Sequence, residues 1–399
     1  MMHRVAAALI AVVCCWAAGG APLHAQPSWL SGYLQTAPLF SGATKLTPSN
    51  ASNFSRVRVT IDPSAGPFSF EAAYEHAVSF RQRNVTPGFG LGGVQSGAEW
   101  LELQGTITSS DQEHVVWVHR FDRLNVGWRP SDAADVRIGR QTISWGTTLF
   151  LSPADPFVPF IPADPFRVFR AGVDALRVRV YPGPLSEIDV VVRPTDTDVG
   201  EEVTALGRGL TTWRNWELSG WGGTLYGDVA GAFGAAGGIG AWAVRAEAVI
   251  REIDGTIVGR GTIGLDRAFF FANGRTLSFG WEYQRDGLGA TSPDDYLGIL
   301  QSREFRRGEL QVFGRDETVV NGAYQLSPLW TVGSFVLWNI NDDSVLAAPS
   351  LAYSASDNTA VSGGLFFGFG DTEITEARPL PSEYGLAAIT GFMQVSWFF

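Results

Sequence analysis

Arginines recur on the polar faces of strands that we predict in the first half of the chain. Arg56 and Arg58 alternate with apolar residues in the stretch RVRVTI, and Arg177 and Arg179 do so in the stretch LRVRVY. Such alternation places the arginines on one face of a strand and the apolar residues on the other; Arg137 follows the same pattern. A row of guanidinium groups can pair with carboxylates in a stiff lattice, or it can order water and select charged solutes. The sequence leaves both uses open.

The connection at residues 145–172 is the second candidate, because it repeats the sequence PADPF at positions 153–157 and 162–166. Its prolines stiffen the backbone, and its phenylalanines are costly to leave in water. If the strands close into a barrel, we expect this loop to fold inward and to form the narrowest point of the lumen. Asp155 and Asp164 would then face the arginines across that constriction. The alternative is a loop that caps the rim or contacts a neighbouring subunit.

Short alternating segments make up most of the remaining chain, and they are typical of half-buried strands. We predict an all-β fold, a transmembrane antiparallel barrel of about 16 strands in a range of roughly 14–18. Short turns at one rim and long loops at the other are typical of such a barrel. One long stretch, residues 81–97, falls on the short-turn rim in this register. The other long stretches fall on the opposite rim: residues 145–172, 195–219, 287–310 and 370–383.

The composition excludes several classes of protein. With 40 acidic against 29 basic residues and a pI of about 5.0, the chain lacks the basic surface of a nucleic-acid-binding protein. A mean hydropathy of +0.05 is too low for a bundle of membrane helices, but it suits strands with one face toward lipid and one toward water. A large soluble β-sandwich or β-propeller is the alternative. Tryptophans recur along the apolar faces, as membrane interfaces require, and they favour the membrane barrel.

Both ends of the chain indicate export and membrane insertion. Residues 1–25 have a short basic start, an apolar centre and a cleavage site, which together are typical of a secretory signal peptide. We assign residues 26–53 to an N-terminal periplasmic segment and residues 54–399 to the barrel. The last strand alternates apolar and polar residues up to Trp397 and Phe399. This ending resembles the terminal strand by which bacterial outer-membrane proteins engage the barrel-assembly machinery.

A wider resemblance lies between residues 137 and 181. The segments GRQTISWG at 139–146, PADPF at 153–157 and RAGVD at 170–174 resemble a group of uncharacterised porin-like outer-membrane barrels. The resemblance implies a barrel that passes small solutes, without a known substrate. Alginate-export barrels share a similar strand signature, so a role in saccharide export stays an alternative.

We expect no catalytic residues, no metal site and no cofactor. The sequence contains no nucleotide-binding or zinc-binding motif, and both cysteines, Cys14 and Cys15, lie in the signal peptide. The function that we predict is a porin-like channel, not an enzyme, for passive passage of small hydrophilic solutes through the outer membrane of a Gram-negative bacterium. The alternatives are a narrow gated barrel for hydrophobic or saccharide substrates and a structural barrel without an open pore. The expected partners are outer-membrane lipid and lipopolysaccharide, the barrel-assembly machinery and small solutes, with a homotrimer as the candidate assembly and no nucleic acid.

Overall fold

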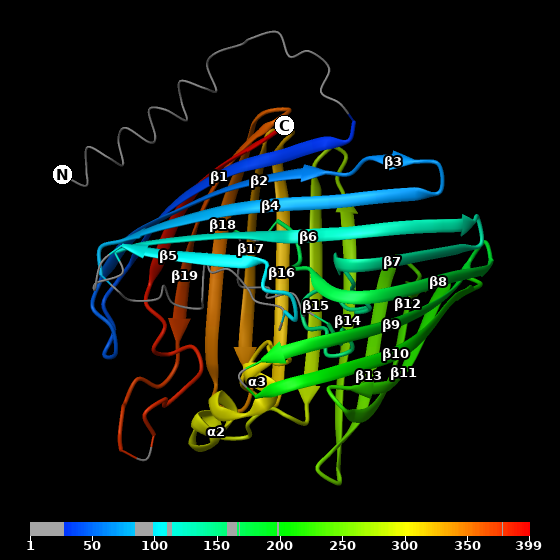
Figure 1. The fold of residues 1–399 in the computed structure, drawn as a ribbon. Helices are drawn as coiled ribbons and strands as arrows, with labels where there is room; N and C mark the ends of the chain where they lie inside the picture. Colours follow the sequence, from blue (N-terminus) through cyan, green and yellow to red (C-terminus); the bar gives the residue numbers. More distant parts are fainter. Residues whose placement is uncertain are drawn as a thin grey trace.

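An antiparallel β-sheet that closes on itself forms almost all of the structure (Figure 1). The computed structural model describes residues 28–83, 99–109, 114–157, 166, 168–197, 199–376 and 378–399. The predicted signal peptide lies outside these described residues. Among the helices of the described residues, none is both long and apolar enough to cross a membrane. The predicted fold class, an antiparallel barrel, is confirmed.

The sheet contains 20 strands, of which 18 form the closed ring. The two others are the short β3 (Ser64–Ala65) and β5 (Gln104–Ser109), which pair only with β4 and β6, respectively. The ring closes where β1 pairs with both β2 and β20. Its strands are β1 (Leu30–Ser41), β2 (Asn50–Ile61), β4 (Phe68–Arg81), β6 (Val115–Ser131), β7 (Ala134–Gln141), β8 (Val173–Gly183), β9 (Ser186–Thr197), β10 (Gly200–Trp213), β11 (Trp216–Leu225), β12 (Asp228–Ile239), β13 (Trp242–Ile253), β14 (Thr256–Phe270), β15 (Thr276–Asp286), β16 (Asp316–Ser327), β17 (Trp330–Asn339), β18 (Ser344–Ser356), β19 (Thr359–Phe369) and β20 (Thr390–Phe398).

The first difference from the predicted 16 strands is β1. It lies within residues 26–53, which the sequence assigns to a periplasmic segment, so the barrel begins at Leu30. Its alternation is hidden because apolar side chains occupy both faces. Ala37 and Leu39 are buried in a cluster with Phe166 inside the barrel, while Phe40 is exposed on the other face. A strand with apolar residues on both faces gives no signal of period two.

The strand predicted near residues 98–108 is the short β5, which stands outside the ring, and the remaining differences lie between β9 and β13. β10 occupies most of the stretch 195–219, which the sequence predicts to be a long loop. Its exposed face has Gly207 and Gly209 at mid-strand, between the exposed Val203 and Trp213, so the row of apolar side chains that reveals other strands is interrupted. β11 and β12 replace a single strand predicted at 220–233, and they are joined by the tight turn Tyr226–Gly227, with φ values of 51° and 84°. Two positive φ values suit a two-residue hairpin turn.

The extra strand β1 moves the connection that follows β4 to the opposite rim, and the exclusion of β5 from the ring leaves the later long connections at the rim predicted for them. The turns at one rim are short, and β1 begins and β20 ends at that rim, which we call the short-turn rim (Figure 1). The stretch 81–97 therefore belongs with the other long connections and is no exception. The opposite rim, the long-loop rim, carries all four long connections: 82–114, 142–172, 370–389, and 287–315 with η2 (Pro293–Asp295), α2 (Tyr296–Gln301) and α3 (Arg303–Arg306).

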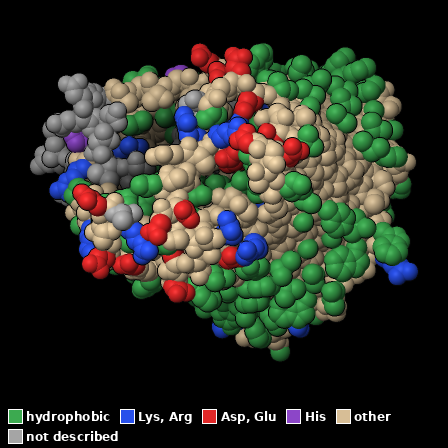
Figure 2. Space-filling view, turned by 90° about the horizontal axis from the view of Figure 1, so that it is seen from below, with side chains coloured by type: hydrophobic (Ala, Val, Ile, Leu, Met, Phe, Trp, Pro, Cys, Tyr) green, Lys and Arg blue, Asp and Glu red, His purple; other side chains and the backbone are tan. Residues whose placement is uncertain are grey.

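Apolar and charged side chains lie on opposite faces of the barrel wall. Hydrophobic side chains cover the flank, whereas acidic and basic side chains gather over the long-loop rim (Figure 2). On the flank, Ile250 and Ile257 are 63% and 75% exposed, while Glu247 and Arg251 of the same hairpin are buried. A soluble protein would bury the isoleucines and expose the charges. The reverse arrangement is typical of a barrel that faces lipid outside and polar groups inside.

Candidate functional site: a loop inside the lumen

The connection 142–172, which we call the inner loop, is held by two glutamates of the barrel wall. Glu247 on β13 accepts hydrogen bonds from the backbone N–H groups of Thr147, Thr148 and Ala154, at 2.8, 3.2 and 2.9 Å. An ionised carboxylate is a strong acceptor, and its bonds to backbone N–H groups are stronger than bonds between neutral groups. The Glu247 side chain therefore fixes the backbone of the inner loop on one side of the lumen.

Glu282 on β15 binds the next turn of the same loop. Its carboxylate accepts the backbone N–H groups of Leu149, Phe150 and Leu151, at 2.6, 3.0 and 2.8 Å. The loop has no sheet neighbour there, so these bonds satisfy N–H groups that would otherwise be costly to bury. Together the two glutamates bind six backbone N–H groups of the inner loop.

Contacts with other strands show that the inner loop crosses the lumen. Because β2, β9 and β11 also contact it, the loop meets the wall at widely separated strands. The predicted inward-folded loop is thus confirmed. The contacts are the Trp145 Nε1–H bond to Asp189 at 2.9 Å, the Trp221 Nε1–H bond to the carbonyl of Ala154 at 2.9 Å, the Arg193 bond to the carbonyl of Phe157 at 3.2 Å and the Arg56 bond to the carbonyl of Phe166 at 3.2 Å.

Phe157 and Phe166 of the inner loop are buried in two clusters inside the barrel, whereas Phe169 is 48% exposed. Phe157 packs edge-on against Trp145, with ring centroids 4.9 Å apart, and the pair contacts apolar residues of β8 to β13. Phe166 packs against Phe54 of β2 and Phe392 of β20. Phe392 breaks the polar pattern of the last strand because it faces this apolar cluster instead of water. These contacts supply the apolar surface that the loop requires.

A second long connection fastens the inner loop from the long-loop rim. Gln311 accepts the backbone N–H of Ser152 at 2.8 Å and donates to the carbonyl of Phe150 at 2.7 Å. The neighbouring Glu309 is buried and forms an ion pair with Arg251 of β13 at 2.5 Å. Burial raises the pKa of Glu309, while the surrounding arginines lower it. The two connections therefore form one packed unit on the wall.

Each of the five arginines that the sequence singles out has a carboxylate partner. Arg56 and Arg58 are buried, whereas Arg137, Arg177 and Arg179 are partly exposed. This pairing supports the lattice interpretation, and a role in selecting solutes stays a prediction. The pairs are Arg56–Glu75 at 3.5 Å, Arg58–Asp122 at 2.8 Å, Arg137–Glu71 at 3.6 Å, Arg177–Asp189 at 2.6 Å and Arg179–Asp135 at 2.8 Å.

Asp155 has a local role that the sequence does not reveal. Its carboxylate is buried and pairs with Arg170 of the same loop at 2.5 Å, and it accepts the Ser144 hydroxyl at 2.8 Å. The expectation that it faces the wall arginines is wrong, because this partner lies within the loop. Burial raises the pKa of Asp155, and Arg170 and Ser144 lower it. Asp164 lies outside the described residues.

The GRQ segment proves to be a structural joint beside the inner loop. Arg140 is fully buried and binds Asp174 through two hydrogen bonds, at 2.9 and 2.8 Å. Gly139 has a φ of 113°, and a Cβ at that position would lie 2.3 Å from the carbonyl oxygen of Leu124. Gln141 donates to the carbonyl of Ala175 at 3.0 Å. These residues tie the two strands from which the loop departs and returns.

The two glutamates that hold the loop were not among the residues singled out from the sequence. A signal for them exists, since Glu247 and Glu282 each stand at mid-strand on the polar face of an alternating segment. That signal shows that the two side chains lie on the polar face of their strands, but it does not show which groups they bind. Their partners are backbone N–H groups about 100 to 130 positions away in the chain, which carry no sequence signature.

The terminal residues close the barrel beside β1. Phe399 donates its backbone N–H to the carbonyl of Gly32 at 3.0 Å and accepts the N–H of Gly32 at 2.8 Å. A Cβ at residue 32 would lie 2.4 Å from the carbonyl oxygen of Arg58 and 2.4 Å from the Phe399 ring, so glycine is required there. The Trp397 ring lies 5.1 Å from that of Phe399 on the same face. Their role as an assembly signal stays a prediction.

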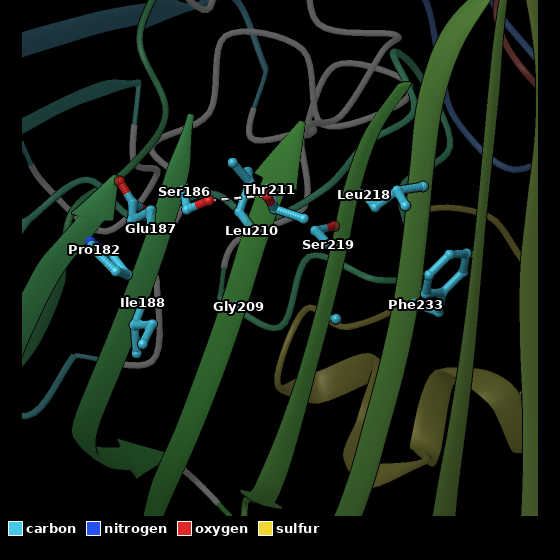
Figure 3. A pocket seen from close by; sticks show the side chains of 11 residues that line it. Pro182, Ser186, Glu187, Ile188, Gly209, Leu210, Thr211, Leu218, Ser219 and Phe233 are labelled. Carbon is cyan, nitrogen blue, oxygen red and sulfur yellow. Dashed lines mark hydrogen bonds between the residues drawn. The ribbon is translucent and has the colours of Figure 1, made fainter. Parts of the chain in front are cut away.

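The outer wall also has a shallow groove of about 340 Å³ near the short-turn rim. Gly209 and Gly220 lie side by side between Ile188 and Phe233, so a gap two strands wide separates the larger side chains (Figure 3). The groove lies outside the lumen and has no part in the site. Within the described part of the chain, no group of His, Cys, Asp or Glu is arranged to hold a metal ion.

Comparison with known proteins gives structural neighbours only. No family model matches the chain, and no curated protein sequence matches it. The barrel is similar to OccAB1 of Acinetobacter baumannii, with a TM-score of 0.58, 11% identity and coverage of 93% of this chain and 96% of that chain. A BenF-like porin from Pseudomonas fluorescens Pf-5 gives a TM-score of 0.54, 10% identity and coverage of 93% and 98%. Pseudomonas aeruginosa OpdK, solved with vanillate, gives a TM-score of 0.51 and 9% identity, with coverage of 93% of this chain and 98% of that chain. At such low identity, these similarities establish a porin-type barrel fold.

Proposed function

We propose that this protein is an outer-membrane channel through which small hydrophilic solutes pass passively. The observation that carries the proposal is the inner loop, which a porin-type barrel holds inside its lumen through Glu247 and Glu282. A loop fixed across the lumen narrows the path and can set the size of solute that passes. The long-loop rim would face the outside and the short-turn rim the periplasm, as in other barrels of this kind. The signal peptide and the Phe399 ending support export and assembly in the outer membrane.

A narrow gated barrel is the second candidate function. The two apolar clusters around Phe157 and Phe166 fill part of the lumen, which favours a restricted path over a wide pore. OpdK, which has a similar barrel, was solved with the small molecule vanillate. A narrow path for one class of small molecule is therefore an alternative to general diffusion.

Electrical recording of the purified full-length protein in planar bilayers tests these possibilities. A general channel gives stable current steps that scale with salt concentration. A gated barrel gives small or rare steps, together with uptake of one solute class into liposomes that carry the protein. The absence of both current and solute uptake, with folded protein present in the membrane, would leave a structural barrel and overturn the proposal.

A further inference from the structure

Two arginines of the β14–β15 hairpin lie among aromatic rings on the outer face of the wall, near the short-turn rim. Arg267 belongs to β14, and its neighbour Asp266 pairs with Arg245 at 2.9 Å. Arg245 also donates to the carbonyl of Thr147 in the inner loop, so this pair faces the lumen. Successive residues of a strand point to opposite faces, and Arg267 therefore points toward the lipid side of the wall.

Aromatic rings surround the Arg267 guanidinium. Its central carbon lies 4.5 Å from the ring centroid of Phe269 and 5.5 Å from that of Trp242. Trp242 is edge-on to both Phe269 and Phe279, at 6.2 and 6.1 Å, and Phe279 is the strand partner of Arg267. Contact between a cation and ring faces orients the guanidinium but leaves its N–H groups free to donate.

No carboxylate neutralises Arg267 within the described residues. None of the ion pairs or hydrogen bonds found there includes it, and its Nε is buried without a partner. Arg245 and Arg260 on the lumen side differ in this respect, since each binds an aspartate. A guanidinium that faces lipid without a counter-ion is costly, so an anionic group is expected to approach it from the membrane.

Arg275 lies closer to the rim on the same outer face. It donates to the hydroxyl of Tyr324 at 3.4 Å, and the Tyr324 ring lies 6.1 Å from that of Phe271. Arg267 stands three residues before the end of β14 at Phe270, which corresponds to roughly 10 Å along the strand. The two arginines thus lie at the depth where the headgroups of a bilayer meet its acyl chains.

We propose that Arg267 binds the phosphate group of a phospholipid at the short-turn rim, and that Arg275, nearer the rim on the same face, adds positive charge beside the headgroup. A guanidinium offers forked N–H donors that match phosphate oxygens, and the rings of Trp242 and Phe269 provide an apolar surface for the start of the acyl chains. The arrangement suits a phosphodiester joined to a hydrophobic body, because charge and apolar surface adjoin. The proposal goes beyond passage of solutes and requires only that the barrel is embedded in a membrane.

Native mass spectrometry of the detergent-purified full-length protein, titrated with phosphatidylglycerol, tests this site. We expect Arg267→Gln combined with Arg275→Gln to lower the lipid-bound fraction roughly tenfold, since each substitution removes charge-assisted bonds. Arg214→Gln is the matched control, because Arg214 also lies at the short-turn rim and stacks on Trp213 at 4.7 Å, yet stands outside the proposed site. Arg267→Lys alone keeps the charge but loses the fork, and it should give an intermediate loss if the double variant does not fold.

Three results would overturn the proposal. The first is equal lipid retention by the wild type and by the folded double or Arg267→Lys variant. The second is an equal loss of lipid in the Arg214→Gln control. The third is displacement of the lipid from the wild type by millimolar inorganic phosphate, which would reveal a site for the free ion. Retention against phosphate supports a lipid site, since acyl chains add binding that the ion lacks. Conductance is recorded in parallel, so failure of the lipid site and failure of the channel are separate outcomes.

Discussion

The carboxylate of Glu282 on β15 accepts the backbone N–H of Leu151 at 2.8 Å, although the two residues are 131 positions apart in the chain. With Glu247 on β13, it turns the inner loop into a fixed element of the lumen. A side chain on the wall thus determines where a loop backbone lies. The path through the barrel depends on that anchoring.

Removing both anchors should loosen the inner loop. The variant Glu247→Ala with Glu282→Ala loses six hydrogen bonds to carboxylates, and each such bond contributes roughly 1.5–3 kcal/mol before losses from non-additivity. We expect higher single-channel conductance and more current noise in planar bilayers. Glu217→Ala removes an exposed glutamate of β11 and should leave both unchanged. Conductance and noise equal to the wild type in the double variant would show that other contacts hold the loop.

Deleting residues 153–166 should widen the lumen. The deletion removes Phe157 and Phe166, which occupy the two apolar clusters. Insertion should survive, because the ring of strands pairs without the loop. We expect a larger conductance step in the deleted protein. An unchanged step, together with ready cleavage of the intact loop by protease added to whole cells, would place the constriction elsewhere.

Replacing Arg177 and Arg179 by Gln should shift the ion preference toward cations. Both side chains are partly exposed, at 15% and 23%, and their removal leaves Asp189 and Asp135 without these partners. The reversal potential under a salt gradient measures the change. Adding Asp189→Asn and Asp135→Asn restores the charge balance and should reverse the shift. A reversal potential that does not respond to the arginine substitutions would exclude these side chains from the ion path.

Arg140→Gln should destabilise the barrel. Breaking a buried ion pair by removing one partner costs about 3–5 kcal/mol, and Arg140 is fully buried against Asp174. We expect Arg140→Gln to lower the melting temperature, measured as the temperature at which the band of the folded protein disappears from a gel. Arg285→Gln is the control, because Arg285 is 62% exposed in its pair with Asp316 and exposed pairs contribute little. Equal melting of the Arg140→Gln and wild-type proteins would contradict a structural role for the GRQ segment.

Deleting Phe399 should impair assembly. The deletion removes both backbone bonds to Gly32 and the ring that fills the space beside it. The fraction of protein that migrates as the compact, heat-modifiable form in outer-membrane preparations measures assembly. Phe398→Ala keeps the terminal residue and should assemble better than the truncated chain. Insertion of the truncated chain at wild-type levels would show that Phe399 is dispensable.

The sequence alone predicts the fold class and favours the inward position of the loop. Period-two alternation indicates strands with unlike faces, and the phenylalanines of residues 145–172 require an apolar surface, which the lumen, the rim or a neighbouring subunit can provide. Alternation also shows which way Arg177 and Glu282 point, because it depends only on local geometry.

Only the tertiary structure decides the number of strands and the partner of each inward side chain. β1 and β10 escape detection because packing inside the barrel and glycines outside erase the alternation. The partners of Glu282 and Glu247 depend on which segments the closed ring brings together across the lumen, and alternation within one strand holds no information about that. Closure of the barrel therefore decides which of the side chains that face the lumen contact one another.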